Sequence, residues 1–441
     1  MMTRLVGCLG AMLFTLSAFG EQPINKSNMT PEEIREANQQ ESHKIVFVGN
    51  GEQASADSVA RAVRMFYADQ YRHFKDPLAP NFLLMSRDAN IAMGIGGAVR
   101  MRGWADFNGS INANGFIPYL IPVPSDPTQR RRIGGTPGGT SLFMRVIGFN
   151  TLIKTFNAYI QADFSGPGNV GFKLKKAYVI MSDWTVGYAT TTFADPAAEV
   201  PTIDGAGPNG EASKTAMLVR WMHDFNSHWS MAASVEMPSS QVDADGTRTQ
   251  VLNDWMPDYV AFGQYSWAHG QHVRLSGMMR TIPYRDLVTG VNHNKIGWGA
   301  QLSTFLKPAN PLAIFGIVNY GEGYGSYMGD LSVGNYDLVP TAGHPGQLHA
   351  PRSLGISGGL RYSFRPNVYA CAAYGQARYY NHDSEYKSTD YRIGRYFAAN
   401  IFWEPTPRLQ AGIEYLWGQR NNFDGNHNHA NRVDVLFQFS F

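Results

Sequence analysis

The sequence predicts an all-β protein: a transmembrane, up-and-down antiparallel β-barrel of about sixteen strands, preceded by a short helical N-terminal segment. Three observations predict this fold. Apolar residues recur with a period of two from about residue 90 to the end, short connections alternate with long ones, and the last residue is an aromatic inside a strand pattern. Strands of such a barrel alternate between a lipid-facing apolar side and a polar side facing the interior.

Composition supports a barrel over a set of soluble domains. Of the 441 residues, 46 are glycine, aromatic residues make up 13% and charged residues 16%, whereas ordinary domains contain about 25% charged residues. The net charge of +2 gives no basis for nucleic-acid binding. There are two cysteines, Cys8 and Cys371, and loss of the first with a signal peptide excludes an internal disulfide.

Residues 1–20 are predicted to be a secretory signal peptide. Arg4 precedes an apolar run that reaches Ala18, and a small-x-small cleavage site ends at Gly20. The run is shorter than the about 20 apolar residues of a membrane-spanning helix. Together with the predicted barrel, this places the processed chain in the outer membrane of a Gram-negative bacterium.

Residues 21–88 are predicted to form a helical segment that is either periplasmic or plug-like. Thr30-Pro31-Glu32-Glu33 matches a capping box with proline at the first helical position. From Ala56 to Phe74, apolar residues are spaced by three and four, as on an amphipathic helix. The segment is too short for the full plug domain of an energy-coupled receptor.

Residues 89–441 are predicted to form the barrel. In the last strand, Val433, Val435, Phe437, Phe439 and Phe441 share one face, and the opposite face is polar except for Leu436. The same alternation recurs in the segments 91–107, 156–164, 273–280, 356–364 and 409–420.

Two segments of the predicted barrel do not give a clear face assignment. Leu312 to Tyr320 is apolar on both faces, which fits a subunit contact or a patch covered by the N-terminal segment. Phe172 to Met181 mixes lysines and apolar residues.

The connections alternate as in an up-and-down barrel with short periplasmic turns and long outer loops. The link at residues 165–169 is the exception, since it should be long and is short. Long connections are predicted at 108–140, 191–213, 238–256, 283–293, 321–354, 380–390 and 421–430.

The connection at residues 191–213 is the candidate constriction loop. If it folds into the barrel, its acids face wall arginines and narrow the pore; the alternative is an ordinary loop with solvated carboxylates. Its candidate residues are Asp195, Glu199, Asp204, Asn209 and Glu211. The alternation also predicts charged pore-lining residues on the wall, namely Arg100, Arg102, Asp106, Arg274, Arg280, Arg361, Glu414 and Arg420.

No motif predicts catalysis, a cofactor or a metal site. Gly355-Ile356-Ser357-Gly358-Gly359 matches the G-x-S-x-G pattern, but a nucleophile elbow needs a strand-to-helix turn and this segment continues as a strand. His427-Asn428-His429 and Asp243-Ala244-Asp245-Gly246 are better explained as polar loops than as metal sites.

Several motifs resemble the DcaP-like outer-membrane porins. They are Phe193-Ala194-Asp195, Pro201-Thr202-Ile203-Asp204, Gly207-Pro208-Asn209-Gly210, and the late run from Gly412 to Arg420 with the phenylalanine-rich last strand. The resemblance covers roughly Ala89 to Phe441. It implies a sixteen-stranded trimeric channel that prefers small anionic solutes, including dicarboxylates, with Asp195, Asp204 and Asn209 as constriction-loop positions. The chain departs from the family in lacking a long heptad coiled coil near its N-terminus.

The sequence thus predicts a porin rather than an enzyme: a passive diffusion channel that supports ion transport. The predicted partners are small hydrophilic solutes, with anions preferred, and outer-membrane lipid; the predicted assembly is a homotrimer. One alternative is a hydrophobic-solute transporter with the helix near Phe66 to Phe74 as a stopper. Another is a lipase- or protease-type barrel enzyme using histidines at the rim, namely His344, His349, His382, His427 and His429.

Overall fold

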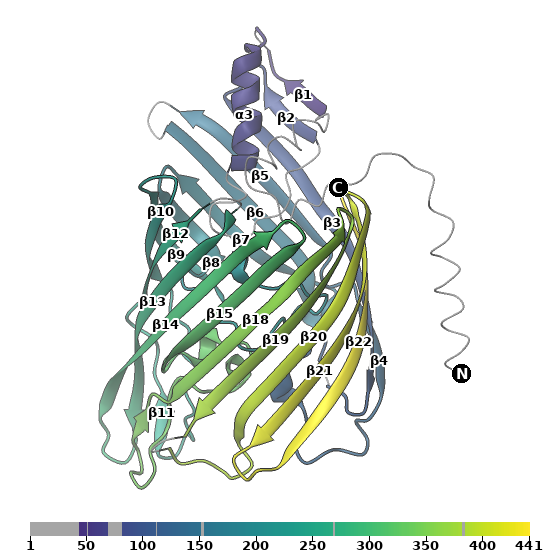
Figure 1. Ribbon diagram of the computed structural model, residues 1–441. Helices are drawn as coiled ribbons and strands as arrows, with labels where there is room; N and C mark the ends of the chain where they lie inside the picture. Colours follow the sequence, from purple (N-terminus) through teal and green to yellow (C-terminus); the bar gives the residue numbers. More distant parts are fainter. Residues whose placement is uncertain are drawn as a thin grey trace, which may run out of the picture.

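The chain closes into a single β-barrel, as the sequence predicts (Figure 1). The computed structural model describes residues 44–50, 52–68, 82–111, 113–150, 154–267, 270–381 and 384–441. Within these residues, sixteen antiparallel strands form the wall. Closure comes from β22 (His427–Ser440), which pairs with β3 (Ile91–Phe107) from Asn431 opposite Phe107 to Ser440 opposite Ala98.

The wall follows chain order, each strand pairing with the next. The place next to β3 in the wall is shared by β4 (Arg132–Thr136) and β5 (Ser141–Asn150), each of which pairs with a different part of β3. The others are β6 (Lys154–Gly166), β7 (Gly171–Met181), β8 (Trp184–Thr190), β9 (Thr215–Asp224), β10 (Trp229–Glu236), β12 (Asp258–Ser266), β13 (His272–Asp286), β14 (Asn292–Ala309), β15 (Leu312–Glu322), β18 (Arg352–Arg365), β19 (Val368–Tyr380), β20 (Tyr391–Thr406) and β21 (Leu409–Asn422).

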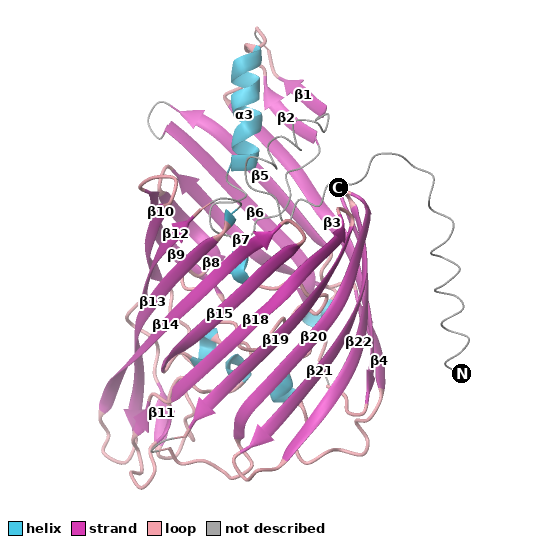
Figure 2. Cartoon of the chain, viewed as in Figure 1, coloured by secondary structure: helices cyan, strands magenta, loops and turns pink. Residues whose placement is uncertain are grey.

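One end of the barrel carries short turns and the other carries the long loops. We call these the short-turn end and the long-loop end. The long loops include residues 108–131, 191–214, 237–257 and 323–351, and contain β11 (Thr249–Val251), β16 (Val339–Pro340), β17 (Leu348–His349) and 3-10 turns η3 (Pro118–Leu120), η5 (Pro196–Ala198), η7 (Gly325–Tyr327) and η8 (Leu331–Val333). Figure 2 shows short helical turns inside the barrel.

Two connections predicted to be long are short. β13 continues to Asp286 and β14 begins at Asn292, and β21 continues to Asn422 with β22 beginning at His427. Polar residues that resemble a loop in the sequence therefore belong to the strand ladders, since strand ends near the rim tolerate polar side chains. The link between β6 and β7, η4 (Pro167–Asn169) with Val170, is short as the sequence indicates.

The structure explains the three departures from simple alternation, at Leu436, in β15 and in β7. Leu436 points inward and is buried in an interior apolar cluster with Ile203 and Phe116. The inner face of β15 joins the same cluster, together with Val200, so the loop at residues 191–214 covers this face. In β7, a register irregularity between Gln161 and Ala162 of β6 interrupts the alternation.

The N-terminal segment forms a small β-α-β unit at the short-turn end (Figure 1). β1 (Lys44–Val48) pairs in parallel with β2 (Phe82–Ser86), which pairs with β3. The predicted amphipathic helix is present as α3 (Ala56–Ala68), whose Ala62 is buried with Leu83, Met85 and Ile147. Both strands were missed by the sequence analysis. The predicted signal peptide and the capping box near Thr30 lie outside the described residues.

Among the described residues, none of the helices is long and apolar enough to cross a membrane.

The two faces of β22 predict opposite responses to a new charge. Val435 points outward and is 47% exposed, whereas Gln438 points inward. An arginine in place of Val435 would lie in hydrocarbon and cost about 2–4 kcal/mol near the bilayer centre. We expect V435R to lower the free energy of unfolding in lipid vesicles by this amount and Q438E, whose carboxylate would face Arg100, to change it little. Equal losses in the two variants would contradict the assigned faces.

Candidate functional site

The connection between β8 and β9, residues 191–214, folds into the barrel along its inner wall. Phe193, Ala194, Ile203 and Asn209 are all buried. The loop passes the wall at β13 and β14, then at β20, β21 and β3, and finally at β15 and β18 before it returns to β9. The in-folded arrangement is therefore the one that forms.

The first anchor of this loop is Asp195, which is buried against β13 and β14. Its carboxylate lies 2.9 Å from Nε2 of His272 and 3.5 Å from the Arg274 guanidinium, and it accepts a 2.6 Å hydrogen bond from Ser303. Burial alone would raise the pKa of Asp195, but Arg274 and His272 hold that pKa below its ordinary range. The carboxylate thus stays charged and fixes this part of the loop deep in the barrel.

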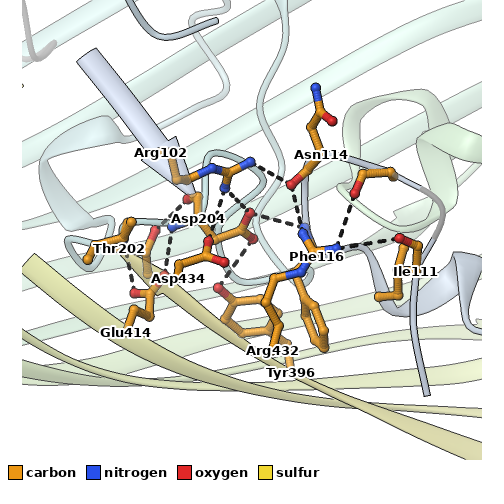
Figure 3. A network of polar contacts seen from close by, with 12 residues as sticks. Arg102, Ile111, Asn114, Phe116, Thr202, Asp204, Tyr396, Glu414, Arg432 and Asp434 are labelled. Carbon is orange, nitrogen blue, oxygen red and sulfur yellow. Dashed lines mark hydrogen bonds and ion pairs between the residues drawn. The ribbon is translucent and has the colours of Figure 1, made fainter. Parts of the chain in front are cut away.

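The second anchor is Asp204, within the network of Figure 3. Its carboxylate lies 2.9 Å from the Arg102 guanidinium and accepts a 3.0 Å hydrogen bond from the backbone N–H of Phe116. Glu414 of β21 accepts hydrogen bonds from the backbone N–H groups of Ile203 and Asp204, at 3.0 and 2.6 Å. Wall and loop therefore hold each other through both side chains and backbone.

The same network fixes the first long loop, residues 108–131. Arg432 of β22 pairs with Asp106 of β3 at 2.6 Å and donates to the carbonyl oxygen of Ala113. It also donates to the carbonyl oxygen of Asn114 (Figure 3). Phe116 is fully buried within the barrel. Arg432 was not among the predicted pore-lining residues, although the alternation in β22 indicates that its side chain points inward.

A third loop, residues 323–351, meets the other two at Asp330. This buried carboxylate accepts hydrogen bonds from Asn209 Nδ2 at 2.7 Å, from the Tyr391 hydroxyl at 2.8 Å and from the backbone N–H of Tyr119 at 3.3 Å. Burial raises the pKa of Asp330 from an ordinary value of 3.8 to about 6, against the lowering effect of these donors. The Asp330 carboxylate thus connects its own loop with the other two loops and with β20.

Arg280 attaches this third loop to the wall. Its guanidinium lies 3.0 Å from Asp337 of the loop and 3.3 Å from Asp258 of β12. Lys214, at the end of the loop between β8 and β9, approaches Asp258 to 3.3 Å. Asp258, Asp330 and Asp337 could not be predicted as site residues, because no local motif marks them in the sequence.

All the predicted wall residues point into the barrel, but most are covered. Arg100 and Arg420 remain partly exposed. Arg100 donates to the carbonyl oxygen of Ile203 and Arg420 to that of Tyr119. The buried ones are Arg102, Asp106, Arg274, Arg280, Arg361 and Glu414.

The predicted loop residues separate into two groups. Asp195, Asp204 and Asn209 are buried and bind the wall or another loop. Glu199 and Glu211 are half-buried, and Glu211 accepts a 3.0 Å hydrogen bond from Ser357. The two glutamates therefore have more contact with the lumen than Asp195, Asp204 and Asn209.

Exposed charge on the inner wall is found on β7. Lys173 lies opposite Asp163 and Lys176 opposite Gln161, both at inward positions of β6. Lys175 approaches the Asp163 carboxylate to 3.2 Å and its side chain is 41% exposed. The exposed Lys173 together with the pair of Lys175 and Asp163 gives this part of the wall an excess of positive charge.

One rim histidine contacts a serine: His349 Nε2 lies 3.0 Å from Ser384 Oγ. The other ring nitrogen faces the Thr341 hydroxyl at 3.1 Å, where a catalytic triad would place a carboxylate. His344 contacts the Ala342 carbonyl oxygen, His427 and His429 are exposed, and His382 lies outside the described residues. The part of the chain that the structure describes contains no group of three metal-ligating His, Cys, Asp or Glu residues.

Comparisons with known proteins agree with this architecture. The family model described as DcaP outer membrane protein matches residues 97–441. The outer membrane channel DcaP of Acinetobacter baumannii is similar in structure with a TM-score of 0.69 and 20% identity, over 80% of this chain and 98% of that one. The anion-selective porin from Comamonas acidovorans has a TM-score of 0.54 and 8% identity, over 80% and 100%. Salmonella typhi OmpF has a TM-score of 0.50 and 10% identity, over 80% and 98%. At these identities the structural likeness shows the fold. No curated protein sequence matches the chain.

Asp330 should make the stability of the loop assembly depend on pH. Because its folded pKa of about 6 lies above the ordinary 3.8, the protonated form stabilises the fold fully below pH 3.8, and this contribution is lost as the pH rises through 6. D330N keeps the shape without the ionisation. We expect the free energy of unfolding of D330N, relative to wild type, to rise by roughly 2 kcal/mol between pH 4 and pH 7.

Urea unfolding in lipid vesicles at the two pH values measures this difference. D424N, in the exposed turn before β22, is the control and should show no such change. An identical pH dependence for D330N and wild type would refute the role of Asp330.

Proposed function

The chain belongs to the DcaP outer membrane protein family, and from this premise we propose that it is a passive channel for small hydrophilic solutes that prefers anions. The observation that carries the proposal is the loop 191–214, pinned along the inner wall by Asp195 and Asp204. A loop fixed in this way sets the width of the pore, a role that needs no catalytic chemistry. Solutes would be selected by size and by the charges that remain exposed.

The preference for anions rests on the exposed charges of the inner wall. Lys173, Lys175 and Lys176 of β7 and the partly exposed Arg100 contribute positive charge, against Asp163 and the two half-buried glutamates. A neighbour in fold is named an anion-selective porin, and the family resemblance extends the proposal to dicarboxylates. Rings of exposed charge select ions by attraction and by repulsion of the opposite sign.

Assembly and topology complete the proposal. Removal of residues 1–20 would leave residues 21–88 in the periplasm and residues 89–441 as the barrel. The position of β1, α3 and β2 at the short-turn end supports this topology, because short turns face the periplasm in such barrels. The homotrimer is proposed from the family resemblance.

Removing the lysines of β7 should reduce the anion preference. In planar bilayers with a salt gradient across the membrane, wild type should give a reversal potential of the sign that favours chloride. K173Q/K175Q/K176Q should lower the chloride-to-potassium permeability ratio severalfold, because three charges leave the lumen wall. K387Q, in the exposed loop between β19 and β20, is the control. A cation-selective wild type, or an unchanged ratio in the triple variant, would refute the assignment.

Removing the Asp195 anchor should widen the channel. D195N takes away the carboxylate that pairs with Arg274 and His272, and breaking a buried pair in this way costs about 3–5 kcal/mol. Single-channel recordings should show a larger mean conductance and more fluctuation. E199Q changes a half-buried glutamate of the same loop and should alter ion preference while leaving the current steady. A steady D195N channel of wild-type conductance would contradict the constriction role.

A further inference from the structure

Three arginines lie on the outer face of the barrel near its long-loop end. They are Arg352 of β18, Arg378 of β19 and Arg395 of β20, and we call them the arginine row. Side chains alternate between faces along a strand, and the neighbours of each arginine point into the interior, where Ser353, Ala377, Tyr379, Gly394 and Tyr396 are buried. The arginines therefore point away from the pore.

Strand pairing places the three arginines side by side. Arg352 lies opposite Tyr380, two residues from Arg378 on the same strand. Arg378 lies opposite Ile393, two residues from Arg395. From each arginine to the next, the position shifts by two residues toward the short-turn end. Because barrel strands tilt by about 35–45° from the barrel axis, this shift keeps the three arginines at nearly the same height in the membrane.

Exposed aromatic residues mark this height as a membrane interface. Phe397 is two residues from Arg395 toward the short-turn end, on the same face, and is 37% exposed. Tyr374 on β19 and Tyr320 on β15 also point outward, at 40% and 38% exposed. Outward-facing aromatic girdles lie at the boundary between hydrocarbon and headgroups, so the arginine row lies at the level of the headgroups.

The contacts of the row leave it positively charged. Arg352 pairs with Glu322 at 2.9 Å, with side chains 55% and 32% exposed. Arg395 donates to Gln419 at 2.9 Å, and Arg378 stacks on the Tyr380 ring at 4.5 Å. Three guanidinium groups face one carboxylate, and these neutral contacts orient Arg378 and Arg395 without cancelling their charge.

We propose that the arginine row binds the phosphate groups of glycolipid headgroups in the outer leaflet. Guanidinium groups bind phosphate with two parallel hydrogen bonds, and a row of them matches a headgroup with more than one phosphate. The adjacent aromatic face would contact the first part of the acyl chains. The inference rests on the proposed channel only for its orientation, with the long loops outside the cell.

Titration of the purified full chain with diphosphorylated lipid A, followed by native mass spectrometry from neutral detergent, tests the proposal. R352Q/R378Q/R395Q should bind lipid A roughly a hundredfold more weakly than wild type, about fivefold for each arginine removed. R87Q/R365Q/R408Q, which removes three exposed charges at the short-turn end, should bind like wild type. Equal affinity in the row variant and wild type would overturn the proposal.

Two further measurements separate the alternatives. Inorganic phosphate at the same concentration should not displace lipid A, and displacement would show a free-phosphate site instead. Single-channel conductance of the row variant should equal that of wild type, since the row lies outside the pore. Loss of lipid binding with normal conductance therefore tests the row independently of the channel, and R378Q alone serves as a milder variant if the triple variant folds poorly.

Discussion

The burial of arginine side chains inside the barrel is the constraint on which the rest of the interior depends. A guanidinium group is always charged and carries five N–H donors, so removing it from water is costly unless carboxylates and carbonyl oxygens surround it. Arg102, Arg274, Arg280 and Arg432 all lie in this situation. The wall supplies some of their partners, namely Asp434, Asp258 and Asp106. The loops supply the others, namely Asp204, Asp195, Asp337 and the backbone carbonyl oxygens of Ile111, Ala113 and Asn114. The inward fold of the loops thus completes the coordination of guanidinium groups that the wall alone would leave partly unpaired.

Close approach between backbones makes this interior possible. Gly210, on the returning part of the loop 191–214, lies against β18, where a Cβ would collide with the Ile356 carbonyl oxygen. A Cβ on Gly355 would collide in turn with the Gly210 carbonyl oxygen. The glycine-rich run from Gly355 to Gly359, rejected as a nucleophile elbow, thus has a packing role: it lets the returning part of the loop lie flat on the wall.

The sequence predicts the wall much better than the interior. Period-two alternation is a local property, so the faces of β3 and β22 could be assigned residue by residue. The alternation does not decide the role of the loop acids, because the sequence around a loop carboxylate is the same whether its side chain contacts water or an arginine. Asp330 shows the limit most clearly, since its partner Asn209 is 121 residues away and no spacing connects them. Likewise the apolar inner face of β15 could not be explained until Val200 and Ile203 were seen to pack in the same cluster.

Interior charges have two different roles, and burial separates them. A charge that is fully desolvated and paired, such as Arg274 with Asp195, presents little field to a solute because its partner cancels it at short range. Such a pair determines where the loop lies and hence how wide the passage is. A charge in contact with water, such as that of Lys173, acts on passing ions over about 8–10 Å at ordinary ionic strength. A count of all inward-pointing arginines therefore overestimates the electrostatic attraction of the lumen wall for anions. In the channel that we propose, charge preference follows from the few cations that the loops leave uncovered, and pore width follows from the many that they cover.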